Sequence, residues 1–276
     1  MNKQAVWSIA RKDMRGITSN IQIWLPMLIL PLILGVILPG VLVTAAGRAD
    51  LAAAKESRYI IEMIDNLPPG DLKNLLAGLP SLNHKLVYVL INYMFAPLFL
   101  LIPVMASSVI GANSFVGEKE RKTLESLLFA PIDLQSLFLG KVLSAFIPAM
   151  AVSWCTFILY GVTVNSIAYP MFRSLIFPNW NWLALLVWVI PVLSISIILI
   201  NVLISAKVKG YQEAYQLGGL VILPVLGLVA GQMTGLLFLN SATLLIIGAA
   251  IFAVNLWLFR RVARWNSRNK LFESQV

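Results

Sequence analysis

The chain has 276 residues, of which 59% are hydrophobic and 12% are charged, with a formal net charge of +9. A soluble domain has about 25% charged residues, so the composition excludes an ordinary soluble protein and indicates one that lies in a membrane. One Cys and one His exclude a disulfide framework and predict no metal site, because both need several such residues. We expect Cys155 to pack as a small buried hydrophobe and His84 to lie at a membrane interface.

Residues 3–20 predict an amphipathic helix. At 100° per residue its polar face carries Arg11, Lys12 and Arg15. A basic amphipathic helix with a Trp on its apolar face suits the headgroup plane of a membrane. We therefore predict that residues 1–22 lie on the membrane surface and contact lipid. The apolar stripe comprises Val6, Trp7, Ala10, Met14, Ile17 and Ile21.

Apolar runs of about 18 or more residues are candidate transmembrane helices, and residues 23–261 contain six of them. The predicted fold class is an all-α integral membrane protein with six spans. A polar insert, 47–86, and an aromatic loop, 165–181, lie on one side of it. A charged region, 113–136, a short loop, 207–216, and a basic tail, 262–276, lie on the other. The spans cover roughly 23–46, 86–112, 137–163, 182–206, 217–237 and 242–259.

The distribution of basic residues predicts the orientation of the chain. The N-terminus, the region 113–141, the loop 207–216 and the C-terminal tail hold 15 of the 21 Lys and Arg residues. Cytoplasmic segments of membrane proteins carry the excess of Lys and Arg. Both termini, the charged region and the 207–216 loop are therefore predicted to be cytoplasmic, and the insert to be on the outer side.

The densest charged run, 117–131, reads GEKERKTLESLLFAP. Glu118 with Lys122, and Arg121 with Glu125, are i,i+4 pairs that support a short helix. Pro131 disfavours helical angles at the residue before it, so the helix should end near Ala130. An amphipathic helix between two spans must lie at the water interface, where a soluble partner can reach it. The simpler alternative is an ordinary solvated loop.

This run resembles the cytoplasmic motif of ABC transmembrane type-2 permeases, which reads roughly E-x-E-x-x-T-L-E-x-L-L-x-x-P followed by Gly-Lys. Many members have Gly before the Thr, where this chain has Lys122. The 207–216 loop also resembles the family, and with the N-terminal helix the resemblance covers nearly the whole chain. The matching positions are Glu118, Glu120, Thr123, Leu124, Glu125, Leu127, Leu128, Pro131, Gly140, Lys141, Lys209, Glu213 and Ala214.

The resemblance implies the membrane subunit of an ATP-driven exporter. It implies an elbow role for the N-terminal helix at Trp7, Arg11, Lys12 and Arg15. Its partners would be an ABC-type ATPase subunit and a second copy or a related permease. ATP and Mg would bind to the ATPase, with no cofactor on this chain. The residues expected to couple to the ATPase are Glu118, Glu120, Arg121, Thr123, Leu124, Glu125, Leu128, Pro131, Lys209 and Glu213.

The chain offers few residues for chemistry of its own. No GxxxxGK[ST] sequence is present, so we expect no P-loop nucleotide site and no enzymatic activity. The spans hold almost no charge, which argues against a proton-coupled carrier. Neutral residues, Asn92 and Phe95 on the second span and Ser194 and Asn201 on the fourth, are candidates for a substrate path. Interhelical hydrogen bonding is the simpler interpretation of them.

Two other functions stay open. The first is an ATP-independent channel or secondary carrier, which would move solute without an ATPase. The second is an intramembrane hydrolase, which would need a nucleophile such as Ser107, Ser194 or Ser205. A nucleic-acid partner is not expected, because the membrane topology accounts for the positive charge. The sequence does not identify the substrate.

Overall fold

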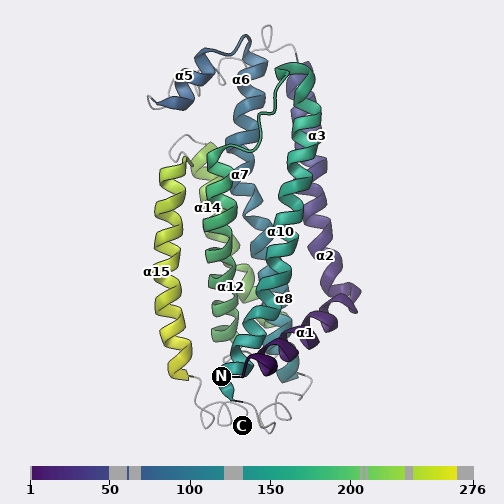
Figure 1. Ribbon diagram of the computed structural model, residues 1–276, viewed down its shortest axis with the longest axis vertical. Helices are drawn as coiled ribbons and strands as arrows, with labels where there is room; N and C mark the ends of the chain where they lie inside the picture. The colour runs from purple at the N-terminus through teal and green to yellow at the C-terminus, as the bar shows by residue number, and fades with distance from the viewer. Residues whose placement is uncertain are drawn as a thin grey trace.

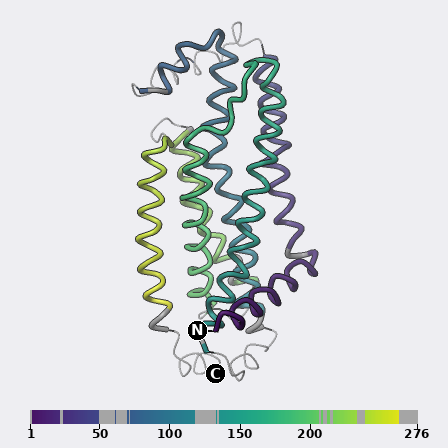
Figure 2. Tube along the Cα trace, in the orientation of Figure 1, coloured from purple at the N-terminus to yellow at the C-terminus, as the bar shows by residue number. Residues whose placement is uncertain are grey.

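The computed structural model describes residues 2–49, 61, 70–120, 133–205, 208, 211–233 and 239–265. These residues form helices, most of which run side by side along one axis (Figures 1 and 2). One helix, α1 (Lys3–Thr18), instead crosses one end of the bundle (Figure 1). We call this end, where α8 (Leu101–Glu120) ends and α10 (Leu134–Phe172) begins, the basal end. The opposite end is the far end.

The first rod of the bundle is built from three consecutive helical segments. They are α2 (Ile21–Leu32), the π-helical η1 (Ile33–Ile37) and α3 (Leu38–Arg48). Two prolines, Pro26 and Pro31, lie inside α2, and neighbouring helices make such breaks tolerable in a membrane protein. The rod agrees with the predicted first span.

The second rod begins earlier than predicted. After α5 (Asp71–Ala77) and a short turn, the chain continues through α6, η2 and α7 into α8, with a single turn residue, Leu100, between α7 and α8. The apolar stretch therefore runs from Leu82 to Gly117 rather than over 86–112. Because α8 continues to Glu120, the predicted short helix does not start afresh at Gly117. The segments are α6 (Leu82–Val89), the π-helical η2 (Leu90–Met94) and α7 (Phe95–Phe99).

The third rod, α10, corrects the predicted loop at 165–181. It has 39 residues and ends at Phe172, nine residues beyond the predicted end of the span at Thr163. Arg173 ends the helix in a left-handed conformation, with a φ of 51°. The chain then folds back along the helix, where the Asn165 side chain donates to Phe177 O at 2.8 Å and accepts from Phe177 N at 3.2 Å. At 1.5 Å per residue α10 is about 58 Å long.

The fourth and last rods pack against each other. The fourth contains α11 (Trp180–Ala184), the π-helical η3 (Leu185–Val189) and α12 (Ile190–Ser205). The last is α15 (Ser241–Trp265). Asn255 joins them: its amide nitrogen donates to Val192 O at 2.7 Å, and its amide oxygen accepts from Ser196 Oγ.

The predicted fifth span is broken and short. In the described part of the chain it consists of α13 (Tyr211–Gly219) and α14 (Ile222–Met233), with a turn at Leu220–Val221. The apolar stretch Gln216–Gln232 is shorter than a membrane span, whereas five other helices are long enough. Over the residues that the structure describes, the chain therefore forms an all-α bundle with five membrane-length helices, and the count of six stays a prediction. These five are Trp24–Arg48, Leu82–Gly117, Gln135–Phe172, Trp180–Ser205 and Ser241–Val262.

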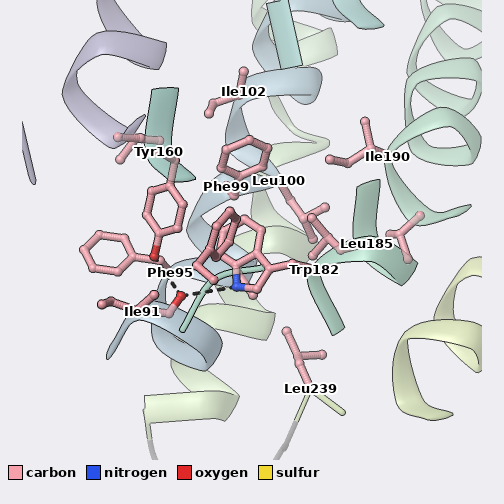
Figure 3. Close-up of a cluster of buried hydrophobic side chains, with 14 of the residues drawn as sticks. Ile91, Phe95, Phe99, Leu100, Ile102, Tyr160, Trp182, Leu185, Ile190 and Leu239 are labelled. Atoms are coloured by element: carbon pink, nitrogen blue, oxygen red, sulfur yellow. Dashed lines mark hydrogen bonds between the residues drawn. The ribbon is translucent and has the colours of Figure 1, made fainter. Parts of the chain in front are cut away.

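An aromatic core holds the rods together. Trp182 and Tyr160 stack with their ring centroids 4.8 Å apart, and Phe99 contacts Trp182 edge-on (Figure 3). Phe177 also contacts Trp182 edge-on. Such pairs contribute about 0.5–1.5 kcal/mol each beyond the burial of their area. The core therefore joins α7, α10 and α11 near the middle of the bundle.

Outer faces of the rods expose apolar side chains, as expected for surfaces that contact lipid. Cys155 is one of these exposed residues on α10, so the prediction that it is buried is wrong. The helical period places it two positions from the buried Ser153, on the opposite side of the helix. Other exposed residues of these faces include Trp154, Ile158, Val162, Ile246, Phe252 and Trp257.

Side-chain hydrogen bonds join the helices at the far end of the bundle. Asn83 Nδ2 donates to the carbonyl oxygens of Ala46 and Ala49, both at 2.8 Å, and so satisfies carbonyls at the end of α3. His84 Nε2 lies 3.3 Å from Met171 O and packs edge-on against the Phe172 ring. His84 therefore joins α6 to the end of α10.

Candidate functional site

The basal end brings α1 against the bundle. One side of α1 is buried and comprises Val6, Ile9, Ala10 and Ile17. Gly140 on α10 makes this close approach possible, because a Cβ there would lie 2.9 Å from both Val6 O and Ile9 Cβ. The amide of Asn2, the N-cap of α1, donates to Ser136 Oγ at 3.0 Å. Helix α1 is thus fixed to the first turns of α10.

A buried ion pair fastens the same junction. Lys141 Nζ lies 3.7 Å from Asp13 Oδ2, and the two side chains are 4% and 9% exposed. Lys141 Nζ also donates to Ser114 O at 2.6 Å, while Ser114 Oγ donates to Asp13 Oδ2 at 3.0 Å. Lys141 Nζ lies over the Phe115 ring, 5.6 Å from the ring centroid. Three helices, α1, α8 and α10, therefore share one charged network.

The start of α10 carries a further acidic group. Asp133 is the N-cap and accepts from the Ser136 amide at 3.1 Å. The hydrogen bond from Ser136 lowers the pKa of this exposed carboxyl. The Asp133 side chain is therefore ionised near neutral pH, which suits the positive end of the helix dipole.

The described parts of the two predicted coupling segments belong to α8 or contact it. The backbone of Glu118 and Glu120 forms the last turn of α8. Val208 packs against Ala112 and Val116, also on α8, so the chain after α12 lies next to that last turn. Glu213 is exposed in the first turn of α13, a helix that contacts α8. The other predicted coupling residues, Arg121, Thr123, Leu124, Glu125, Leu128, Pro131 and Lys209, lie outside the described residues.

The predicted elbow residues face outward from the junction. Trp7 is 53% exposed although it belongs to the predicted apolar stripe. Arg11, Lys12 and Arg15 are exposed as well, and Lys12 Nζ lies 3.6 Å from Asp13 Oδ1. The bundle thus covers the side of α1 that includes Ile9 and leaves Trp7 and the basic residues available to a membrane surface.

The first pair of candidate path residues is buried in the second rod. Asn92 belongs to η2 and Phe95 begins α7, and both are buried. Asn92 Nδ2 donates to Tyr88 O at 3.3 Å, but Asn92 Oδ1 has no hydrogen-bond partner within the described part of the chain. The Phe95 ring packs 5.7 Å from that of Tyr160.

The second pair, Ser194 and Asn201, is buried on α12. Asn201 Nδ2 donates to Ile197 O at 3.0 Å, and Asn201 sits between glycines of two other helices. A Cβ on Gly111 would lie 3.1 Å from Asn201 Nδ2, and one on Gly218 would lie 3.0 Å from Oδ1. Asn201 therefore fills the contact between α8, α12 and α13 by packing, while its hydrogen bond stays within α12. In the described part of the chain Asn201 Oδ1 and Ser194 Oγ have no hydrogen-bond partner, so interhelical hydrogen bonding by this pair stays a prediction.

Sequence reasoning missed the Asp13–Lys141 pair. The sequence predicts Lys141 as one of the basic residues of 113–141 and as part of the Gly-Lys pair, and nothing in it pairs Lys141 with Asp13. One signal was present: Lys141 is the only cation among the 39 residues of the largely apolar segment Leu134–Phe172. A lone charge of this kind must find a partner when the helix packs.

Within the described residues, no group of three or more His, Cys, Asp or Glu side chains could hold a metal ion. The five membrane-length apolar helices define a multi-pass, helical integral membrane protein. Residues 7–261 match the sequence model described as ABC-2 family transporter protein. The chain therefore belongs to the ABC-2 family and is an ABC-2 type permease, the membrane subunit of an ABC transporter. The comparison with curated proteins finds no match.

Proposed function

We propose that this permease exports a substrate across the cytoplasmic membrane with energy from ATP hydrolysed by a separate ABC ATPase subunit. ATP and Mg would bind to that subunit, and this chain would have no cofactor and no catalytic site of its own. Two permease copies, or one copy and a related permease, would form the pathway. Both termini would be cytoplasmic, with the basal end facing the ATPases.

The observation that supports this proposal most strongly is the charged network at the basal junction. The segment between α8 and α10 carries the predicted coupling motif, and the network ties together the helices on either side of it. Ser114 lies six residues before the end of α8, and Lys141 lies seven residues after the start of α10. Asp13 adds α1 to the same unit.

This arrangement suggests how motion would reach the membrane. An ATPase that displaces residues 118–131 would pull on α8 and α10 together rather than on one of them. The elbow helix α1 would follow because it is bonded to both. The three helices would then move as one body against α12, α14 and α15, which hold the other side of the bundle.

Charge reversal in the coupling segment tests the proposal. We expect Glu120→Lys and Glu125→Lys to reduce ATP-dependent transport in proteoliposomes and co-purification of the ATPase, while membrane insertion stays normal. The matched control is Glu62→Lys, a reversal in the insert predicted to lie on the other side, which should change neither. Normal transport in both coupling variants would contradict the assignment. Transport by the purified permease alone would favour a channel or secondary carrier.

A further inference from the structure

A partly open cavity lies within the single chain, apart from the basal junction. It has a volume of about 140 Å³ and is lined by α3, the η2–α7 segment and α14. Its walls are apolar and include Leu42, Phe95 and Val229. Among the described residues that line it, Gln232 has the only polar side chain.

The orientation of the Gln232 amide follows from its one hydrogen bond. Gln232 is 6% exposed, and its Nε2 donates to Tyr93 O at 2.8 Å. A backbone carbonyl can only accept, so the NH₂ group must face Tyr93. The opposite atom, Gln232 Oε1, is an acceptor with no hydrogen-bond partner in the described structure. Burial of an acceptor without a hydrogen-bond donor costs free energy, and a donor on a bound ligand would remove that cost.

We propose that this cavity binds a small, uncharged ring compound with one hydroxyl or N–H donor, which bonds to Gln232 Oε1. The volume is close to the roughly 150 Å³ of a cavity that accepts benzene. The apolar walls exclude a charged ligand. Ordered water needs two to four polar partners, and this wall offers one acceptor. A lipid acyl chain could fill the space but has no donor.

Binding of such a compound does not depend on the proposed transport and is measured without an ATPase. The probes are 4-fluorophenol and fluorobenzene, which share a ring and differ in the hydroxyl. Fluorine NMR on the full chain in lipid nanodiscs, with empty nanodiscs as reference, gives both affinities. We expect saturable binding of 4-fluorophenol, about fivefold tighter than that of fluorobenzene, as one net hydrogen bond provides.

Two variants separate the cavity from the amide. Val229→Phe fills the cavity and keeps Gln232, so saturable binding of both probes should be lost. Gln232→Leu should still bind fluorobenzene but lose the preference for 4-fluorophenol. Gel filtration checks that each variant is folded. If Gln232→Leu does not fold, the loss of binding in Val229→Phe still tests whether the probes occupy the cavity. No saturable binding, equal affinity for the two probes, or unchanged binding in either variant would overturn the proposal.

Discussion

At the scale of single residues, the junction between α1 and the bundle depends on charges that water no longer solvates. Transfer of an ion out of water is costly, and a buried pair offsets the cost only when its remaining hydrogen-bonding groups are satisfied. Lys141 meets this condition through Asp13 and Ser114 O, and Asp13 through Lys141 and Ser114 Oγ. Removal of Asp13 takes the carboxylate away from a buried cation. Removal of Lys141 leaves the buried Asp13 with the exposed Lys12, whose Nζ lies 3.6 Å from Oδ1.

We therefore expect Asp13→Asn and Lys141→Met each to lower the free energy of unfolding by about 3–5 kcal/mol. The double variant should lose clearly less than the sum of the two, because it leaves no unpaired charge. Unfolding in mixed detergent measures all three. The exposed Arg11→Met on the same helix is the control and should cost about 1 kcal/mol or less. Additive losses in the double variant would contradict the pairing.

A second prediction at the scale of single residues concerns Gly140. Gly140→Ala would press a methyl group against the backbone of α1 at Val6 O, 2.9 Å away. Such overpacking costs about 1–3 kcal/mol, so the thermal midpoint of unfolding should fall. Gly16→Ala is the matched control on α1, where nothing lies within 4 Å. It should be neutral or stabilising, because Ala favours a helix. An unchanged midpoint in Gly140→Ala would mean that α1 is not docked there.

At the scale of elements, the π-helical segment η2 determines how the middle of the bundle is bonded. A π-helical turn interrupts the regular hydrogen bonds of an α-helix, and other groups can then use its carbonyls. Ile91 O accepts from Tyr160 Oη at 2.7 Å and from Trp182 Nε1 at 3.2 Å (Figure 3). Tyr93 O accepts from Gln232. Side chains from α10, α11 and α14 thus converge on η2.

Because Ile91 O has two donors, the loss of one should be mild. We expect Tyr160→Phe to lower the free energy of unfolding by about 0.5–1.5 kcal/mol, the net value of one hydrogen bond. In the Trp182→Phe background the same change should cost more, since Ile91 O would then be left without a side-chain donor. A double-mutant cycle measures the difference. Equal costs in the two backgrounds would show that the two donors act independently.

At the scale of the whole molecule, the bundle is longer than a membrane is thick. The hydrocarbon core of a bilayer is about 30 Å thick, whereas α10 is about 58 Å long. At least one end of this helix therefore projects beyond the core. At the far end α3, α6 and α10 are joined by Asn83 and His84. This part of the protein holds together through its own hydrogen bonds rather than through the lipid.

The orientation of the bundle can be tested with single cysteines, because Cys155 is the only one in the chain. In a Cys155→Ala background, Ala77→Cys marks the far end and Gln135→Cys the basal end, both at exposed positions. A membrane-impermeant maleimide should label Ala77→Cys on intact cells. It should label Gln135→Cys only after permeabilisation. The reverse pattern would place the basal end outside and exclude coupling to a cytoplasmic ATPase there.

Much of the architecture can be predicted from the local sequence. The long apolar runs predicted all five membrane-length helices, because a helix that crosses lipid must be apolar along its length. The amphipathic pattern of residues 3–20 predicted α1. The resemblance carried by Glu118, Thr123 and Pro131 led to the family that the match over 7–261 confirmed. Periodicity and motifs are local properties, and they can be read without the fold.

Only the tertiary structure revealed where the chain departs from these patterns. The continuation of α10 past Thr163 depends on Asn165 and the segment that folds back on it. The pairing of Lys141 with Asp13 joins residues 128 positions apart, and no local rule predicts it. Gln232 Oε1 is left without a donor in the described structure because the amide nitrogen of the same side chain donates to Tyr93 O in η2. These features arise from contacts between distant segments, and those contacts form only when the helices pack.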